Sequence, residues 1–151
     1  MPLTVTDAIE RQIEIAAPRD RVWRAITTES EFQQWFGIRI KSGKFQPGVR
    51  LEVLTTHPDF AGIVFHFTVV EMKAPEYFSW RWVPGALEPE GEATTLVEFR
   101  LEETKNGTLV KIKESGFDQI SLGYRAKAFE DNTGGWEHQA KSLASYVAQN
   151  R

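Results

Sequence analysis

Residues 124–151, with the sequence YRAKAFEDNTGGWEHQAKSLASYVAQNR, decide the fold of this chain. Apolar side chains recur there at i, i+4, i+7 and i+11, namely at Trp136, Ala140, Leu143 and Val147. Polar residues fill most positions on the other side, which is the period of a long helix with one apolar face. That face must be buried against another element, and the rest of the chain offers a sheet. We therefore predict a long C-terminal helix that packs on a sheet.

Two adjacent glycines, Gly134 and Gly135, interrupt the pattern of this helix. Each glycine in a helix costs roughly 1 kcal/mol relative to alanine. The pair permits a bend in the helix, or a close approach of the helix to something bulky. It could instead mark the start of the helix, with residues 124–131 forming a separate turn.

Upstream of this helix the sequence alternates between apolar and polar residues, as β-strands do. Two short helices are expected after the first strand, one at 18–27 and a second that Ser30 caps and Gly37 ends. Tight turns, above all at Asn106-Gly107, favour an antiparallel meander. The predicted fold class is α+β, a curved antiparallel sheet wrapped around the long C-terminal helix, with two short helices after the first strand. The expected strands are 8–16, 38–40, 51–55, 63–72, 77–83, 94–102 and 108–114.

One strand, residues 63–72, departs from strict alternation because Val69 and Val70 are both apolar. A bulge there would exchange the two faces of the strand, and the sequence leaves open which face His66 occupies. A lone histidine on a strand is more often structural than catalytic. The three histidines of the chain show no metal-binding spacing, so we predict no metal site.

Length, charge and composition exclude several classes of function. A chain of 151 residues fits a single domain over residues 1–151, and its net charge of −3 argues against a nucleic-acid partner. The chain has no cysteine, so it has neither disulfides nor thiolate chemistry. No signal peptide, membrane-spanning stretch or nucleotide-binding motif is evident. We therefore expect a cytoplasmic protein with no membrane insertion and no cofactor.

Aromatic residues are unusually frequent and make up 12% of the chain. Aromatic side chains line apolar pockets, but they also fill ordinary cores, and the sequence cannot separate these two interpretations. We take eleven aromatic residues as candidates for the wall of a ligand cavity. They are Trp35, Phe36, Phe65, Phe67, Phe78, Trp80, Trp82, Phe99, Tyr124, Phe129 and Trp136.

Glu114 is the polar candidate for the same site. The alternation of its strand places Glu114 on the same inward face as Val110 and Ile112. A carboxylate at that position would stand at the mouth of the cavity. The alternative is that the strand has already ended and that Glu114 is solvated.

Motifs along most of the chain resemble one superfamily. They are Ile13-x-Ile-x-Ala-Pro-x-x-x-Val22-Trp23, Trp35-Phe36, Val69-Val70-Glu71-Met72 before Pro75, Trp80-x-Trp82, Ser115-Gly116-Phe117 and Gly135-Trp136. In this order they resemble the SRPBCC (START-like, helix-grip) superfamily and, more narrowly, its Aha1-domain branch, named for the activator of Hsp90 ATPase. The resemblance implies a sheet that grips the C-terminal helix, commonly with a hydrophobic cavity between them.

The resemblance and the aromatic content together predict the binding of an apolar small molecule, such as a lipid, a polyketide or an aromatic metabolite. One alternative is a co-chaperone-like module that acts on an Hsp90-type chaperone. Another is a cyclase or hydrolase that uses Glu114 or Tyr124, and we favour a protein that is not an enzyme. An exposed strand edge could pair two chains into a homodimer. Residues 84–91 are expected to form a hairpin end rather than a lid.

Overall fold

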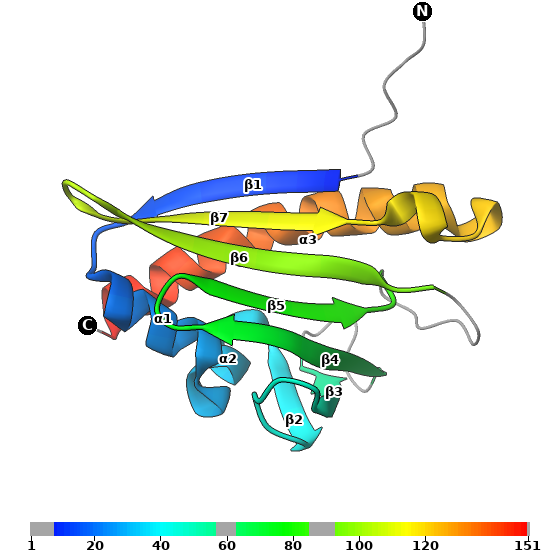
Figure 1. Cartoon of the computed structure of the whole chain (residues 1–151), viewed down its shortest axis with the longest axis horizontal. Coiled ribbons are helices and arrows are strands. Elements are labelled where there is room, and N and C mark those ends of the chain that lie inside the picture. The colour runs from blue at the N-terminus through cyan, green and yellow to red at the C-terminus, as the bar shows by residue number, and fades with distance from the viewer. Residues whose placement is uncertain (1–7, 57–62, 85–92, 151) are drawn as a thin grey trace, which may run out of the picture.

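The structure, a computed structural model, describes residues 8–56, 63–84 and 93–150. Within these ranges, seven strands form one antiparallel sheet in the order β1-β7-β6-β5-β4-β3-β2 (Figure 1). The loop expected at 84–91 lies, apart from Pro84, outside the described residues. The strands are β1 (Ala8–Ile15), β2 (Ile38–Ser42), β3 (Arg50–Thr55), β4 (Val64–Lys73), β5 (Tyr77–Trp82), β6 (Thr95–Thr104) and β7 (Gly107–Ser115), and the helices are α1 (Arg19–Thr27), α2 (Glu29–Phe36), the 3₁₀ turn η1 (Phe117–Gln119) and α3 (Leu122–Gln149).

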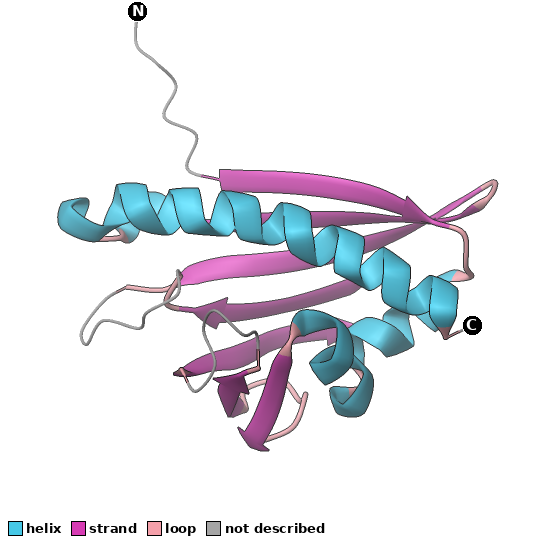
Figure 2. Cartoon of the chain, turned by 180° about the vertical axis from the view of Figure 1, so that it is seen from behind, coloured by secondary structure: helices cyan, strands magenta, loops and turns pink. Residues whose placement is uncertain are grey.

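The helices cover one face of the curved sheet, and α3 crosses that face from one end to the other (Figure 2). The apolar stripe of α3 is buried, with Leu143 and Val147 fully enclosed. The predicted α+β architecture is therefore confirmed. Among the described helices, none is both long and apolar enough to cross a membrane.

α3 is one continuous helix from Leu122 to Gln149. Gly134 and Gly135 lie inside it, so they do not mark its start. A Cβ atom added at either glycine would meet no heavy atom within 4 Å. The expectation that these glycines allow a close approach to a bulky neighbour is therefore wrong, because both positions face open space.

One end of α2 lies where the sequence predicted it and the other does not. Gly37 ends the helix with a φ of 80°, as predicted. Ser30, however, is not the cap, because α1 ends at Thr27 and Thr28 joins the two helices in an extended conformation. The carbonyl oxygen of Thr28 accepts the backbone N–H of Phe32 at 2.8 Å, so α2 starts before Ser30 can cap it.

A bulge between Val69 and Glu71 explains why the apolar pattern of β4 is irregular. Phe67 and Val69 point into the core, whereas Val70 is exposed. His66 therefore occupies the opposite, outer face of the sheet. There its Nε2 atom lies 3.5 Å from a carboxylate oxygen of Glu52 on β3.

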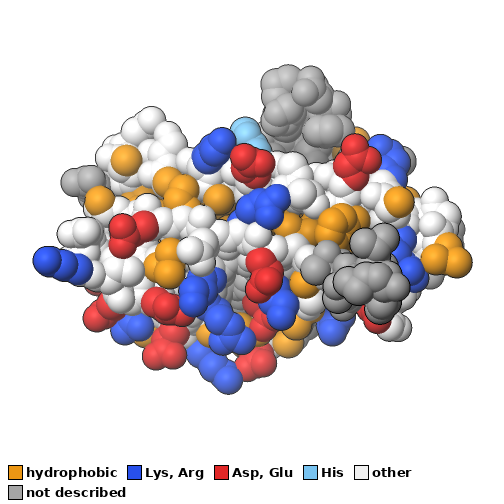
Figure 3. Space-filling model, turned by 90° about the horizontal axis from the view of Figure 1, so that it is seen from above, with side chains coloured by type: hydrophobic (Ala, Val, Ile, Leu, Met, Phe, Trp, Pro, Cys, Tyr) orange, Lys and Arg blue, Asp and Glu red, His pale blue; other side chains and the backbone are white. Residues whose placement is uncertain are grey.

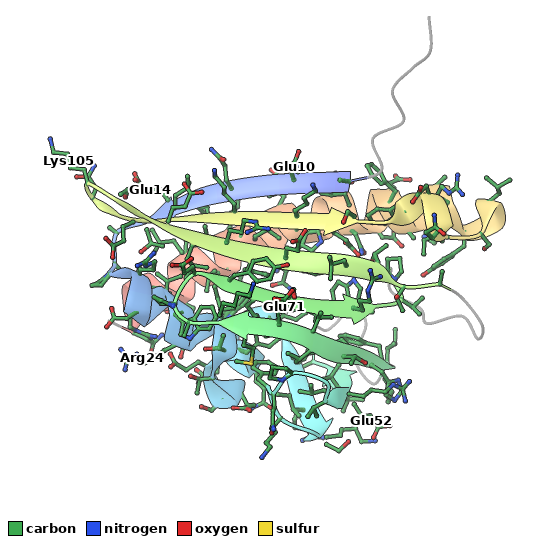
Figure 4. The ribbon with its side chains drawn as sticks, in the orientation of Figure 1. Glu10, Glu14, Arg24, Glu52, Glu71 and Lys105 are labelled. Carbon is green, nitrogen blue, oxygen red and sulfur yellow. The ribbon has the colours of Figure 1, made fainter. Side chains whose placement is uncertain are left out.

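The outer surface of the molecule is charged but balanced in sign. Glu10, Glu14 and Lys105 extend away from the body of the protein (Figure 4). In the view from above, acidic and basic side chains are interspersed and form no single basic face (Figure 3). Pairs across strands, such as Lys111 with Glu102 at 2.9 Å, account for part of this balance.

Arg21 on α1 anchors the C-terminal end of α3. Its Nε and Nη2 atoms donate to the backbone oxygen of Asn150 at 3.0 and 2.7 Å. Nη2 also lies 2.8 Å from Glu31, which in turn accepts the hydroxyl of Tyr146 at 2.9 Å. Burial and this hydrogen bond to Glu31 raise the pKa of Tyr146 above its ordinary value, so the phenol stays neutral and donates. These contacts fix α3 across α1 and α2.

Candidate functional site

A pocket of about 520 Å³ opens between α2, α3 and the ends of the neighbouring strands. Its apolar wall combines residues from α2, β2, β4, β5 and α3. These residues are Trp35, Phe36, Ile38, Phe65, Trp82 and Trp136. Five of the twelve residues that the sequence proposed for the site therefore meet at this wall. A volume of this size lies in the range typical of small-molecule sites.

The floor of the pocket is built at the end of α2. Gly37 turns the chain directly after Phe36, and both Phe36 at the end of the helix and Ile38 at the start of β2 line the pocket. Two side chains of α3 bind the free carbonyls there. Gln139 Nε2 donates to the oxygen of Phe36 at 2.8 Å, and Ser142 Oγ donates to the oxygen of Trp35 at 2.6 Å. These bonds satisfy helix-end carbonyls that otherwise lack partners, and they hold α3 against α2.

Glu114 lies behind the apolar wall and is fully buried. The indole N–H of Trp82 donates to Oε2 at 2.8 Å, and the indole N–H of Trp136 donates to Oε1 at 2.8 Å. Thr95 Oγ1 donates to Oε2 at 2.5 Å, and Asn132 Nδ2 donates to both oxygens at 2.8 and 3.1 Å. The solvated alternative is therefore wrong, and the prediction of an inward-facing carboxylate is correct.

The position of Glu114 follows from strand register. It is the last inward-facing residue of β7, where it is paired with Ile9 on β1 and Val97 on β6. Every donor to it is neutral, and among the described residues Glu114 forms no ion pair. Because its lone pairs are occupied by protein donors, it fixes the two indole rings instead of standing at the pocket mouth.

The two indoles and their neighbours form a continuous aromatic surface. The ring centroids of Trp82 and Trp136 lie 5.8 Å apart at an interplanar angle of 33°. Phe36 lies 6.1 Å from each of them, and Phe65 lies 5.8 Å from Trp82. Trp82 and Phe65 are half-buried, so they offer the larger part of this surface to the pocket.

The remaining candidate residues lie elsewhere. Tyr124 donates its hydroxyl to the backbone oxygen of Pro84 at 2.7 Å, and Phe129 packs edge-on against Phe117 at 5.0 Å. Neither residue lines the pocket. The other four are packed in the core, at most 1% exposed, and they are Phe67, Phe78, Trp80 and Phe99.

The polar wall of the pocket was not predicted from the sequence. Asn132, Gly135, Gln139 and Ser142 are spaced at three or four residues along α3 and form a second stripe beside the apolar one. This helical spacing is a signal that the sequence carries, although nothing in it distinguishes such a stripe from a solvated face. The other residues of the polar wall are Gln34, Thr55, Asp131 and His138. Among the described residues, no cluster of acidic residues, histidine or cysteine could hold a metal ion.

The curved antiparallel sheet, the two short helices after β1 and the long helix α3 define the helix-grip fold of the SRPBCC superfamily. The chain belongs to the family described as activator of Hsp90 ATPase homologue 1-like proteins, whose model matches residues 16–148. The predicted resemblance is thereby confirmed. No match was found among curated proteins.

Several solved structures share the fold at low sequence identity. Protein MLL2253 from Mesorhizobium loti is 20% identical with a TM-score of 0.76, and the match covers 95% of this chain and 98% of that one. The Aha1 dimer from Colwellia psychrerythraea is 20% identical with a TM-score of 0.72, covering 93% and 95%. Protein NE0264 from Nitrosomonas europaea is 18% identical with a TM-score of 0.77, covering all of both chains. At these identities the likeness concerns the fold alone.

Proposed function

We propose that this protein binds an apolar small molecule, such as a lipid, a polyketide or an aromatic metabolite, in the pocket between α2 and α3. The observation that carries the proposal is the wall itself. A pocket of about 520 Å³ is bounded by five aromatic side chains, and two of them, Trp82 and Trp136, are held by hydrogen bonds to a buried carboxylate. Preformed pockets with mostly apolar walls and a few polar groups are typical of ligand sites.

The polar wall supports the same proposal. Gln139 and Ser142 are held by the carbonyls of α2, so they present fixed polar groups beside the aromatic surface. Such groups orient a ligand, whereas the aromatic rings supply most of its buried area. Glu114 and Tyr124 are the residues predicted for a cyclase or hydrolase. Glu114 is buried behind the wall with both of its oxygens occupied by protein donors, and Tyr124 lies outside the pocket lining, where it donates to Pro84. This arrangement favours binding over catalysis.

A pair of glycine substitutions tests the proposal. In Gly135→Leu the new side chain projects into the pocket, because Gly135 lines it and a Cβ there meets no neighbour. In the matched control Gly134→Leu the Cβ atom meets no neighbour either, but Gly134 does not line the pocket. Sterols, flavonoids, polyketides and long-chain alcohols are screened by thermal shift. A compound that binds the native state raises the melting temperature by mass action.

We expect at least one apolar class to raise the melting temperature of the wild type and of Gly134→Leu. The same compound should have little effect on Gly135→Leu, because the leucine occupies its space. Absence of a shift with every class, or equal shifts in both variants, would contradict binding at this pocket.

Family membership favours a second candidate, a co-chaperone-like module that stimulates an Hsp90-type ATPase. This role would use the outer surface and not the pocket. An ATPase assay with an Hsp90 homologue separates the two proposals, because Gly135→Leu should leave any stimulation unchanged. A homodimer is a further proposal, since β1 and β2 end the sheet and leave strand edges unpaired by the sheet itself.

A further inference from the structure

The charges around the pocket are uneven. Among the fifteen residues that line it there is neither a lysine nor an arginine. Asp131 lines the pocket, and it is paired with Lys127 at 3.5 Å, whose side chain is 71% exposed. Behind the wall, the buried carboxylate of Glu114 has no cationic partner. The pocket therefore lies in a field of negative sign.

Two indole rings lie between the carboxylate of Glu114 and the pocket. Both Trp82 and Trp136 point their N–H groups at Glu114, so the positive ends of their dipoles face the carboxylate. The faces of aromatic rings are electron-rich, and they attract cations by their quadrupole. Hydrogen bonding to an anion in a site of low dielectric strengthens this polarisation. Phe36 and Phe65 extend the same surface with two more rings.

We propose that the ligand of this pocket is an apolar cation, a molecule in which a methylated or otherwise substituted ammonium group adjoins an apolar body. Such groups are recognised by cages of aromatic rings, and their weak hydration makes burial less costly than that of a primary ammonium. This inference rests on the proposed function, since it names the class of ligand for the same site. Fatty acids and other anions are disfavoured, because no lysine or arginine lines the pocket to pair with a carboxylate, and the only titratable base in the lining is His138.

Two molecules of equal shape and different charge test the inference. Phenyltrimethylammonium and tert-butylbenzene differ in one atom, nitrogen for carbon, and hence in a full charge. Their binding is followed by chemical-shift changes in ¹H–¹⁵N spectra of the wild-type protein at low ionic strength. We expect the cation to bind at least about tenfold more tightly than its neutral isostere. Benzenesulfonate, an anion of similar size, should bind less tightly than both.

Variants that replace a single carboxylate by an amide show which acid causes the preference for the cation. Asp131→Asn and Glu137→Gln each remove the acid of an i, i+4 pair with a lysine on α3, at 3.5 and 3.7 Å. Asp131 lines the pocket and Glu137 does not. We expect Asp131→Asn to weaken phenyltrimethylammonium binding by about threefold, with tert-butylbenzene unchanged, and Glu137→Gln to change neither. Glu114→Gln, where the variant folds, should weaken the binding of phenyltrimethylammonium more strongly than Asp131→Asn does.

The outcomes separate the two proposals. If tert-butylbenzene binds as tightly as phenyltrimethylammonium, the cation preference is overturned and binding of apolar molecules stands. Equal losses in Asp131→Asn and Glu137→Gln would also overturn it, because the effect would then come from overall charge. If neither probe shifts the pocket signals and no class raises the melting temperature, the proposed function itself fails.

Discussion

At Glu114, four side chains from β5, β6 and α3 converge on one carboxylate. Trp82 and Thr95 reach it from neighbouring strands, and Asn132 and Trp136 reach it from one turn of α3. A buried charge is tolerated only when its lone pairs are satisfied by hydrogen bonds. The same donors orient the indoles that form the pocket wall. Stability and the shape of the site thus depend on one residue.

Trp136 tests this dependence. Its side chain is 3% exposed and contacts the rings of Phe36, Trp82 and Phe99. We expect Trp136→Ala to lower the free energy of unfolding by about 3–5 kcal/mol, because it leaves a cavity and removes a donor to a buried carboxylate. Trp136→Phe, which keeps an aromatic ring, should cost less. Urea unfolding measures both, and a loss below about 1 kcal/mol for the alanine variant would show that the indole is loosely packed.

The sequence predicted part of this residue-scale arrangement. Strand alternation alone placed Glu114 on the inward face, beside Val110 and Ile112. The convergence of donors could not be predicted, because it depends on where α3 crosses the sheet. Asn132 was missed for that reason, since an asparagine on a helix is ordinarily solvated. For Phe67 and Trp80 the residue type was compatible with both core and pocket, and packing assigned them to the core.

At the scale of elements, α3 keeps two glycines in its middle although neither has a close neighbour. Glycine lowers helix stability by leaving the unfolded backbone more freedom. Gly135 lines the pocket, and its missing side chain leaves the pocket open, which gives this glycine a role despite its cost to helix stability. Gly134 faces solvent and has no such role in the structure.

We therefore expect Gly134→Ala to raise the free energy of unfolding by about 0.5–1 kcal/mol. The added methyl group meets no heavy atom within 4 Å, so no strain opposes the gain. The measurement is the midpoint of urea unfolding followed by circular dichroism at 222 nm. Ligand binding should be unaffected. A loss of stability would mean that the helix needs flexibility at this point.

Element boundaries were largely readable from the sequence, because caps and turns act locally. Gly37 ended α2 as predicted, and the hairpin predicted at residues 105–107 joins β6 to β7 through Lys105 and Asn106. The failures came where neighbouring elements compete. Ser30 lost the cap position to Thr28 because α1 and α2 share a single connecting residue. The irregularity at Val69-Val70 became a bulge that only strand pairing could place.

At the scale of the whole molecule, the sheet holds α3 across one face, and the space at the edge of that contact is the pocket. Arg21 fixes one end of α3, and the contacts to Phe36 and Trp35 fix its middle. The fold was predictable because periodicity and family resemblance both report on it. The pocket was not predictable, because its volume depends on how closely the side chains of α2, α3 and the sheet pack, which the sequence pattern does not show.

Titration of ¹⁵N-labelled protein with an apolar compound selected by thermal shift tests the central claim most directly. The account predicts that the indole signals of Trp82 and Trp136 and the amides of Gly37, Gly135 and Gln139 change most. The indole of Trp23, which packs against Phe78 away from the pocket, should stay constant. Uniform changes across the protein, or changes confined to residues outside the pocket, would contradict a ligand site between α2 and α3.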